Sequence, residues 1–191
     1  SCILSACIRR SLPTAPLHGF TAPAPGSGKS YLVDIVCLIS SGREAAVMAQ
    51  GRTSEELEKR LGAMLLAGDP VIAIDNCDVP VGGDFLCAII TQQTTRIRIL
   101  GRSEAPELPS NSLITATGNN LQLEGDMARR AVLCQLDPRE ERPELREFSM
   151  NPAALVKENR GKYVAAALTI LRAYRHAGCP NKPMPLASFE D

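Results

Sequence analysis

Residues 24–30, Ala-Pro-Gly-Ser-Gly-Lys-Ser, have the composition of a phosphate-binding loop. Gly26 and Gly28 let the backbone approach phosphate oxygens and turn its N–H groups inward. Lys29 would place a cation on the terminal phosphates, and Ser30 would offer its hydroxyl to Mg²⁺. The sequence therefore predicts a nucleotide site. The alternative is a Gly/Pro turn followed by an ordinary surface lysine.

The full pattern of such a loop is G-x-x-x-x-G-K-[ST], and its first position here is Pro23 instead of glycine. The match is therefore one residue short. The helix that begins at the loop would add its positive end to the site. We expect the nucleotide to contact seven consecutive residues: Pro25, Gly26, Ser27, Gly28, Lys29, Ser30 and Tyr31.

A second group with suitable chemistry is Asp75, which follows the apolar run Val-Ile-Ala-Ile. Four apolar residues after a proline are typical of a strand buried on both faces. An acid at the carboxyl end of such a strand points into the crevice where ligands bind. Asp75 is thus predicted to hold Mg²⁺ together with Ser30. The alternative is a turn-forming role beside Asn76 and Asp78.

The elements that would position these groups follow from the apolar periodicity. Strands are expected over residues 18–22, 44–49, 71–76, 112–117 and 131–136, and helices over 3–10, 29–40, 54–67, 84–91 and 151–178. Thr53 and Glu56 form a predicted capping box, and Asp84 is a predicted helix cap. Strands alternate with helices, which predicts an α/β P-loop NTPase fold with a mainly parallel five-stranded sheet flanked by helices.

Composition restricts the class of protein further. The 191 residues carry 21 basic and 21 acidic side chains, so net charge gives no drive toward nucleic acid. Seven cysteines without a C-x-x-C pair favour a reduced, cytoplasmic setting, and no apolar run is long enough to span a membrane. We expect an ATPase core over 1–137, a linker over 138–150, and a helical lid or part of it over 151–191. The apolar start suggests a cut in a longer protein.

Four motifs, in this order, carry a resemblance to a known family: Ala-Pro-Gly-Ser-Gly-Lys-Ser, Val-Ile-Ala-Ile-Asp-Asn, Ala-Thr-Gly-Asn-Asn-Leu and Gly-Asp-Met-Ala-Arg-Arg. Over residues 15–137 the chain resembles the AAA+ ATPases, and most of all the ATPase part of phage and prophage primase–helicase proteins, near the superfamily III helicases. The resemblance implies ATP and Mg²⁺ as cofactors, a homo-oligomeric ring such as a hexamer, and DNA, in single-stranded form, as a partner.

The resemblance also implies roles for single residues. Asn119 matches the sensor-1 residue that holds the attacking water, with Asn120 as the alternative; either could simply be a turn residue. Arg129 or Arg130 matches an arginine finger that reaches a neighbouring subunit's nucleotide, and of the two Arg130 is preferred. Arginines at a helix end could instead favour the negative end of its dipole.

A hairpin around Gly101 matches the insertion that touches DNA in the pore of the ring. Arg96, Arg98 and Arg102 would contact phosphates there. The alternative is a solvated strand that carries arginines.

One position departs from the family pattern. Asn76 stands where the second acidic residue, a glutamate, is usual, and an amide cannot accept a proton as a carboxylate does. Asp78 could substitute for it, and Arg160 is a candidate for the sensor-2 arginine. The chain is therefore predicted to be an ATP-hydrolysing motor of a replication helicase. The alternatives are a nucleotide-gated loader or remodelling switch with little hydrolysis, and a small-molecule kinase.

Overall fold

A parallel sheet of five strands forms the centre of the molecule in the computed structural model, which describes residues 1–98, 104–140, 142–182, 184, 186 and 189. The strand order is β2-β3-β6-β1-β7. The strands are β1 (Leu17–Ala22), β2 (Ala46–Ala49), β3 (Val71–Asp75), β6 (Leu113–Asn119) and β7 (Ala131–Gln135). All four pairings are parallel. The predicted α/β fold is confirmed.

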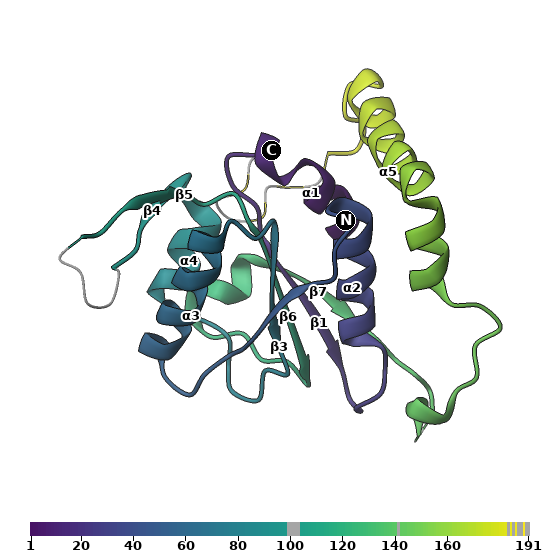
Figure 1. The fold of residues 1–191 in the computed structure, drawn as a ribbon, viewed down its shortest axis with the longest axis horizontal. Helices are drawn as coiled ribbons and strands as arrows, with labels where there is room; N and C mark the ends of the chain where they lie inside the picture. Colours follow the sequence, from purple (N-terminus) through teal and green to yellow (C-terminus); the bar gives the residue numbers. More distant parts are fainter. Residues whose placement is uncertain (99–103, 141, 183, 185, 187–188, 190–191) are drawn as a thin grey trace.

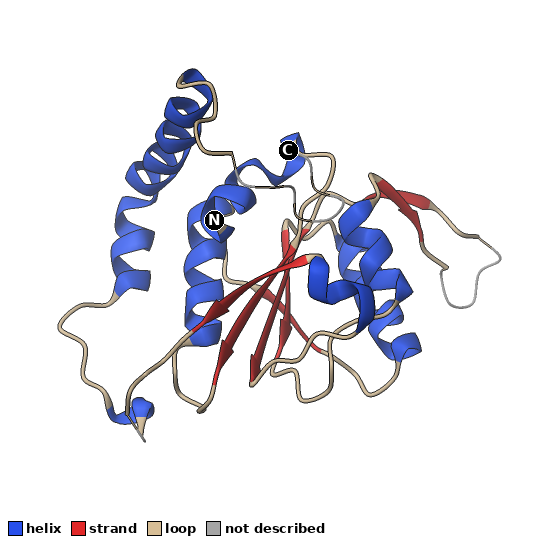
Figure 2. Cartoon of the chain, turned by 180° about the vertical axis from the view of Figure 1, so that it is seen from behind, coloured by secondary structure: helices blue, strands red, loops and turns tan. Residues whose placement is uncertain are grey.

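Helices cover both faces of this sheet (Figures 1 and 2). One face carries α2 (Lys29–Ser40), with α1 (Cys2–Ile8) and α5 (Pro152–His176) packed against it. The other face carries α3 (Ser54–Ala67) and α4 (Asp84–Thr91). Short 3₁₀ helices lie at η1 (Arg9–Ser11), η2 (Gly125–Arg129) and η3 (Pro143–Leu145). Parallel strands place all their carboxyl ends at one edge, so the loops after β1, β3 and β6 meet there.

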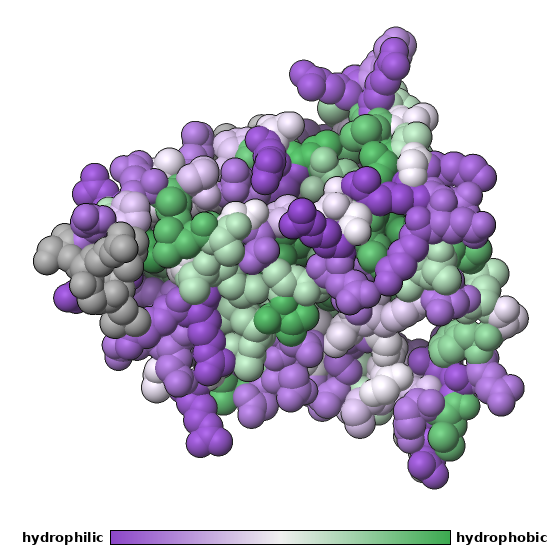
Figure 3. Space-filling model, in the orientation of Figure 1, coloured by the Kyte–Doolittle hydropathy of each residue, from purple (hydrophilic) through white to green (hydrophobic). Residues whose placement is uncertain are grey.

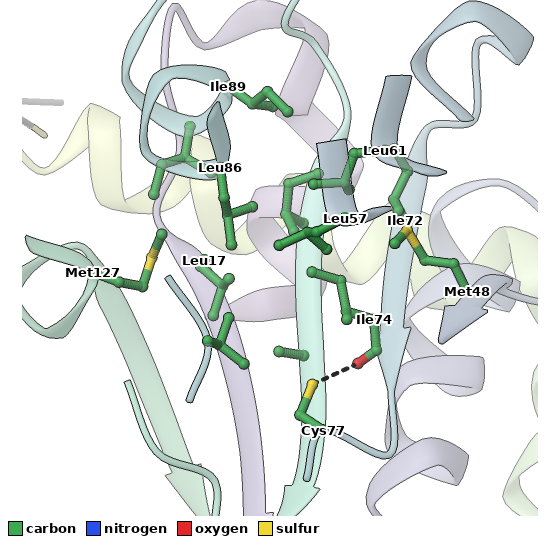
Figure 4. Close-up of a cluster of buried hydrophobic side chains, with 14 of the residues drawn as sticks. Leu17, Met48, Leu57, Leu61, Ile72, Ile74, Cys77, Leu86, Ile89 and Met127 are labelled. Carbon is green, nitrogen blue, oxygen red and sulfur yellow. Dashed lines mark hydrogen bonds between the residues drawn. The ribbon is translucent and has the colours of Figure 1, made fainter. Parts of the chain in front are cut away.

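The apolar core between α3, α4 and the sheet holds β3 in place (Figure 4). Leu57 and Leu61 from α3 pack with Ile72 and Ile74 from β3. Burial of one such side chain contributes about 1.5–3 kcal/mol. Because the core fixes β3 up to Ile74, it also fixes the backbone position of Asp75, which ends the strand at the carboxyl edge of the sheet.

The helix starts follow the predicted capping with two differences. Thr53 Oγ1 accepts the Glu56 N–H at 3.2 Å, but the Glu56 carboxylate accepts from the Arg52 N–H at 2.8 Å instead of from the cap residue. The cap of α4 is Gly83, with φ 102°, and Asp84 is the first helical residue. The prediction that Asp84 caps this helix was wrong because the chain turns one residue earlier, in a conformation that suits glycine.

The longest helix, α5, begins at Asn151, whose side chain accepts the Ala154 N–H. Its backbone leaves helical geometry at Asn159, two residues before Gly161. Figure 3 shows a largely hydrophilic surface on this side of the molecule, with apolar residues interspersed among the hydrophilic ones. Within the described part of the chain, no helix is both long and apolar enough to cross a membrane.

A small hairpin projects from the body of the molecule beside α4 (Figure 1). Its strands β4 (Thr94–Arg96) and β5 (Glu107–Pro109) pair antiparallel. The predicted hairpin is confirmed for these residues. Gly101 and Arg102 lie outside the described residues.

Candidate nucleotide site

The predicted phosphate-binding loop connects β1 to α2 at the carboxyl edge of the sheet. Gly26 has φ 70° and Gly28 has φ 90°, conformations in which a side chain would be strained. Ser27 Oγ donates to Ala24 O at 2.5 Å and closes the turn from inside. The loop is thus shaped by glycine geometry as the motif predicted, with Gly28 as the N-cap of α2.

The lysine of the loop is held by two oxygen acceptors. Lys29 Nζ donates to Asn119 Oδ1 at 2.8 Å and to Ala24 O at 3.2 Å. Desolvation lowers the pKa of Lys29, and the negative charge of Asp75 offsets part of this effect. An ammonium that is partly desolvated beside neutral oxygens is suited to receive a phosphate oxygen.

The two predicted Mg²⁺ ligands are in direct contact. Ser30 Oγ donates to Asp75 Oδ1 at 2.8 Å, although they lie on α2 and β3. A hydroxyl and a carboxylate are both oxygen ligands of the kind that Mg²⁺ prefers. The residues therefore fit the ion: when bound, it would neutralise charge on the β- and γ-phosphates. These two side chains would hold it.

Thr117 of β6 also contacts Asp75, and sequence reasoning did not identify it. Its hydroxyl lies 2.5 Å from Asp75 Oδ1 and 3.2 Å from the Asn76 N–H. Thr117 is 2% exposed. The available signal was a buried threonine two residues before Asn119, on the strand next to β3.

Asn76 is exposed and has φ 54°, the left-handed conformation. Asparagine tolerates this conformation better than most residues with a β-carbon, including glutamate. Asn76 and Asp78 line a cavity of about 360 Å³ that also borders Asp75. The backbone conformation thus gives a physical reason for an asparagine at this position.

Of the two candidate sensor residues, Asn119 faces the loop. Lysine can only donate, so its contact with Asn119 Oδ1 leaves the Asn119 amide N–H₂ group available as a donor. Asn120 instead adopts a left-handed turn with φ 50°, and its backbone N–H donates to Ala22 O.

Tyr31 connects the loop helix to α5. Its hydroxyl donates to Asn151 Oδ1 at 3.0 Å and accepts the Ala153 N–H at 2.9 Å. The hydroxyl is therefore engaged with the start of α5. Tyr31 as a whole is 38% exposed, and its contact with the nucleotide stays a prediction.

The structure places Arg160, the sensor-2 candidate, away from the site. Its guanidinium donates to the carbonyls of Leu38, Ile39 and Ser40. These carbonyls end α2, and the 12 residues of that helix span about 18 Å from the phosphate-binding loop. The candidate role was wrong because α5 runs along α2 and carries Arg160 to its far end.

The segment between β7 and α5 returns to the loop. Glu144 of η3 lies so close to Gly26 that a β-carbon on Gly26 would be 2.8 Å from the Glu144 β-carbon. An acid beside a phosphate-binding loop was not anticipated from the sequence. Arg142 Nε lies 3.1 Å from the Glu144 carboxylate and balances its charge.

The two candidate finger arginines lie far from their own chain's loop. The carbonyl of Arg130 accepts the N–H of Leu17, the first residue of β1. The phosphate-binding loop follows the last residue of β1, about 17 Å away along six residues. Both arginines pair with Asp126, but the side chain of Arg129 is 65% accessible, whereas that of Arg130 is 16% accessible.

The predicted nucleic-acid contacts lie on and beside the projecting hairpin. Arg96 is exposed on β4 and forms an ion pair with Glu107 of β5 at 3.6 Å. Arg98 is also exposed, while Arg102 falls outside the described residues. Two of the three arginines are thus placed on the projection, 21 and 23 residues after Asp75 in the chain.

Comparison with known proteins gives a likeness of fold. No protein-family model matches the chain, and no curated protein sequence matches it. The apo structure of the NrS-1 C-terminal region has a TM-score of 0.57 at 16% identity, over 87% of this chain and 40% of that one. JCV helicase with a bound compound has a TM-score of 0.53 at 14% identity, over 97% of this chain and 50% of that one.

The chain therefore spans only 40% and 50% of the length of these two solved chains. At this level of identity the likeness concerns the fold. The chain has a helicase-like fold, which confirms the resemblance drawn from its motifs.

Proposed function

We propose that this chain is an ATP-binding and ATP-hydrolysing AAA+-type motor domain, from a phage-derived DNA replication helicase or primase–helicase. The observation that carries the proposal is the meeting of Lys29, Ser30, Asp75 and Asn119 at one edge of the sheet, with 2.8 Å contacts between lysine and asparagine and between serine and aspartate. Three elements far apart in sequence supply these groups. The helicase-like fold supports the same class.

The proposed chemistry consists of positioning and charge stabilisation. The loop N–H groups and the α2 N-terminus would bind the phosphates, and Lys29 would exchange Asn119 for a terminal phosphate oxygen. The Asn119 amide would then be released to orient the attacking water. Ser30 would offer a lone pair of its hydroxyl oxygen to the metal while its O–H continues to donate to Asp75 Oδ1.

The proposed site is completed by a neighbouring subunit. Since about 17 Å separates Arg129 and Arg130 from their own loop, either arginine can act only on the nucleotide of another copy. Arg129 is the better candidate because its guanidinium is exposed. This reverses the order suggested by the motif. A ring such as a hexamer would repeat this contact, with Arg96 and Arg98 directed to single-stranded DNA.

A nucleotide-gated loader or remodelling switch is the second candidate. The observation that favours it is Asn76, an amide in a left-handed conformation where a general base is expected. Without a base, hydrolysis would be slower by about 10²–10⁴-fold. Nucleic acid would then leave turnover unchanged, which separates the two functions.

The test is ATP affinity and ATP turnover, with and without single-stranded DNA, for the wild type and Lys29→Ala. We expect Lys29→Ala to weaken ATP binding by at least about tenfold, since a charge-assisted contact is lost. Lys59→Ala is the matched control, because Lys59 is exposed on α3 and pairs only with Glu55 among the ion pairs described. Equal ATP affinity of Lys29→Ala and Lys59→Ala would overturn the proposal.

A further inference from the structure

Thr117 contacts three consecutive residues at the end of β3. Its hydroxyl lies within hydrogen-bond distance of Asp75 Oδ1 and of the Asn76 N–H, and its carbonyl accepts the Cys77 N–H at 2.7 Å. Thr117 is buried in β6, between β3 and β1. One residue of the neighbouring strand thus holds the whole turn that carries the acid.

The direction of these hydrogen bonds is determined by chemistry. The Asn76 backbone N–H can only donate, so the Thr117 oxygen accepts from it. The single hydroxyl proton is then free to donate to the Asp75 carboxylate. Ser30 donates to the same oxygen, Oδ1. Both neutral donors are therefore on one carboxylate oxygen, and Oδ2 remains for the metal or for a water bound to it.

The regular strand pairing ends where these contacts begin. The parallel register of β3 and β6 runs from Val71 beside Leu113 to Ile74 beside Ala116. Beyond it, Asp75 still pairs with Ala49 of β2, but the regular pairing of β3 with β6 has ended and Asn76 is left-handed. At this point the Thr117 hydroxyl, through its hydrogen bonds, takes the place of the regular backbone pairing with β6. It thereby orients the Asp75 carboxylate and the Asn76 backbone.

We propose that Thr117 is a positioning residue for the metal ligand Asp75, and that its hydroxyl sets how strongly Mg²⁺ enhances nucleotide binding. This assignment rests on the proposed nucleotide site. Partners in the second shell of a metal site orient the ligand, and their loss commonly lowers metal affinity by 10–100-fold. Thr117 itself does not touch the nucleotide.

The experiment measures the affinity for a fluorescent ATP analogue with excess Mg²⁺ and with EDTA, for the wild type and three variants. Thr117→Val removes the hydroxyl and keeps the shape, while Thr117→Ser keeps the hydroxyl. Thr115→Val is the matched control, because Thr115 is fully buried two residues earlier on β6 and donates to Ile72 O of the same strand β3. A denaturation curve for each variant compares their stability.

For Thr117→Val we expect the Mg²⁺-dependent gain in affinity to fall by at least about tenfold, with affinity in EDTA unchanged. Thr117→Ser and Thr115→Val should keep the wild-type gain. A wild-type gain in Thr117→Val, or an equal loss with and without Mg²⁺, would overturn the assignment while the nucleotide site stands. A wild-type protein that binds no analogue in either condition would overturn the proposed function and this assignment with it.

Discussion

At the scale of single residues, Asn76 is expected to limit the rate of ATP hydrolysis. Its left-handed backbone suits asparagine, and aspartate tolerates the same conformation. Asn76→Asp would thus introduce a carboxylate of the same size without backbone strain. We predict that this change raises ATP turnover by at least about tenfold, since a general base contributes about 10²–10⁴-fold. Steady-state turnover under saturating ATP measures it.

The matched variant is Asn76→Glu, which restores the residue usual in the resembling family. Glutamate is less tolerant of φ 54°, so we expect a smaller gain and lower thermal stability than for Asn76→Asp. If both acids leave turnover at the wild-type rate, the missing carboxylate does not limit hydrolysis, and the prediction is wrong.

Arg129 and Arg130 are predicted to have different roles, the first in ATP hydrolysis and the second in stability. Arg129→Ala should lower turnover by about 10³-fold or more with ATP affinity unchanged, because a finger acts on the transition state. Arg130→Ala should instead lower the melting temperature by about 2–4 °C, because its largely buried side chain packs against α4 near Thr91. Turnover, ATP affinity and melting curves for both variants decide this. Loss of turnover only in Arg130→Ala would reverse the assignment.

At the scale of the elements, α5 forms hydrogen bonds with α2 near both ends of α2. Tyr31 meets the start of α5, and Arg160 of α5 caps the last carbonyls of α2. Between them Val156 packs with Leu38 and Ile39. The phosphate-binding loop leads directly into α2, and α5 contacts α2 near both of its ends. That the segment 151–191 acts as a lid stays a prediction.

Arg160→Ala should lower the free energy of unfolding by about 1–3 kcal/mol, because it leaves several carbonyls without a charged donor. ATP affinity should remain within about twofold of wild type, since the guanidinium lies at the far end of α2. Arg172→Ala, at an exposed position of the same helix, is the control. Chemical denaturation and ATP titration test both statements. A large loss of ATP affinity with unchanged stability would restore the sensor-2 role.

His18 of β1, a strand between β6 and β7, is predicted to make the stability of the fold depend on pH. Burial lowers the pKa of His18 to about 4, so the folded chain resists a proton that the unfolded chain accepts near pH 6.5. Stability therefore falls as pH falls from about 6.5 toward 4, by about 2 kcal/mol between pH 7 and pH 5.

His18→Gln should remove most of that dependence, whereas His176→Gln, at the exposed end of α5, should keep it. Urea denaturation at a series of pH values is the measurement. Identical pH profiles for the wild type and His18→Gln would contradict the prediction.

The elements and much of the site could be predicted because local signals are strong there. Glycines at 26 and 28 specify a loop geometry, and Asp75 ends an apolar run whose length indicates a strand. The contacts of Thr117 could not be predicted from the sequence, because they depend on how β6 is aligned with β3. The position of Arg160 depends likewise on the packing of α5 along α2, which periodicity along one helix does not determine.

At the scale of the whole molecule, the nucleotide loop and the exposed arginine lie at opposite ends of β1. In the proposed assembly these two different surfaces would form a heterologous contact, which generates a ring where the rotation between subunits closes. In the proposed function, ATP turnover would therefore depend on assembly. We predict that turnover per chain rises more than linearly with protein concentration, measured with ATP in excess. Strict proportionality down to nanomolar protein would contradict it.

The most direct test of the central claim is the ATP turnover of a mixture of Lys29→Ala and Arg129→Ala chains. Each variant alone lacks one half of every site and should be inactive. In a random equal mixture, an intact loop meets an intact finger at about a quarter of the contacts between subunits, so about a quarter of the wild-type turnover should return. A mixture no more active than its separate components would contradict a site shared between subunits.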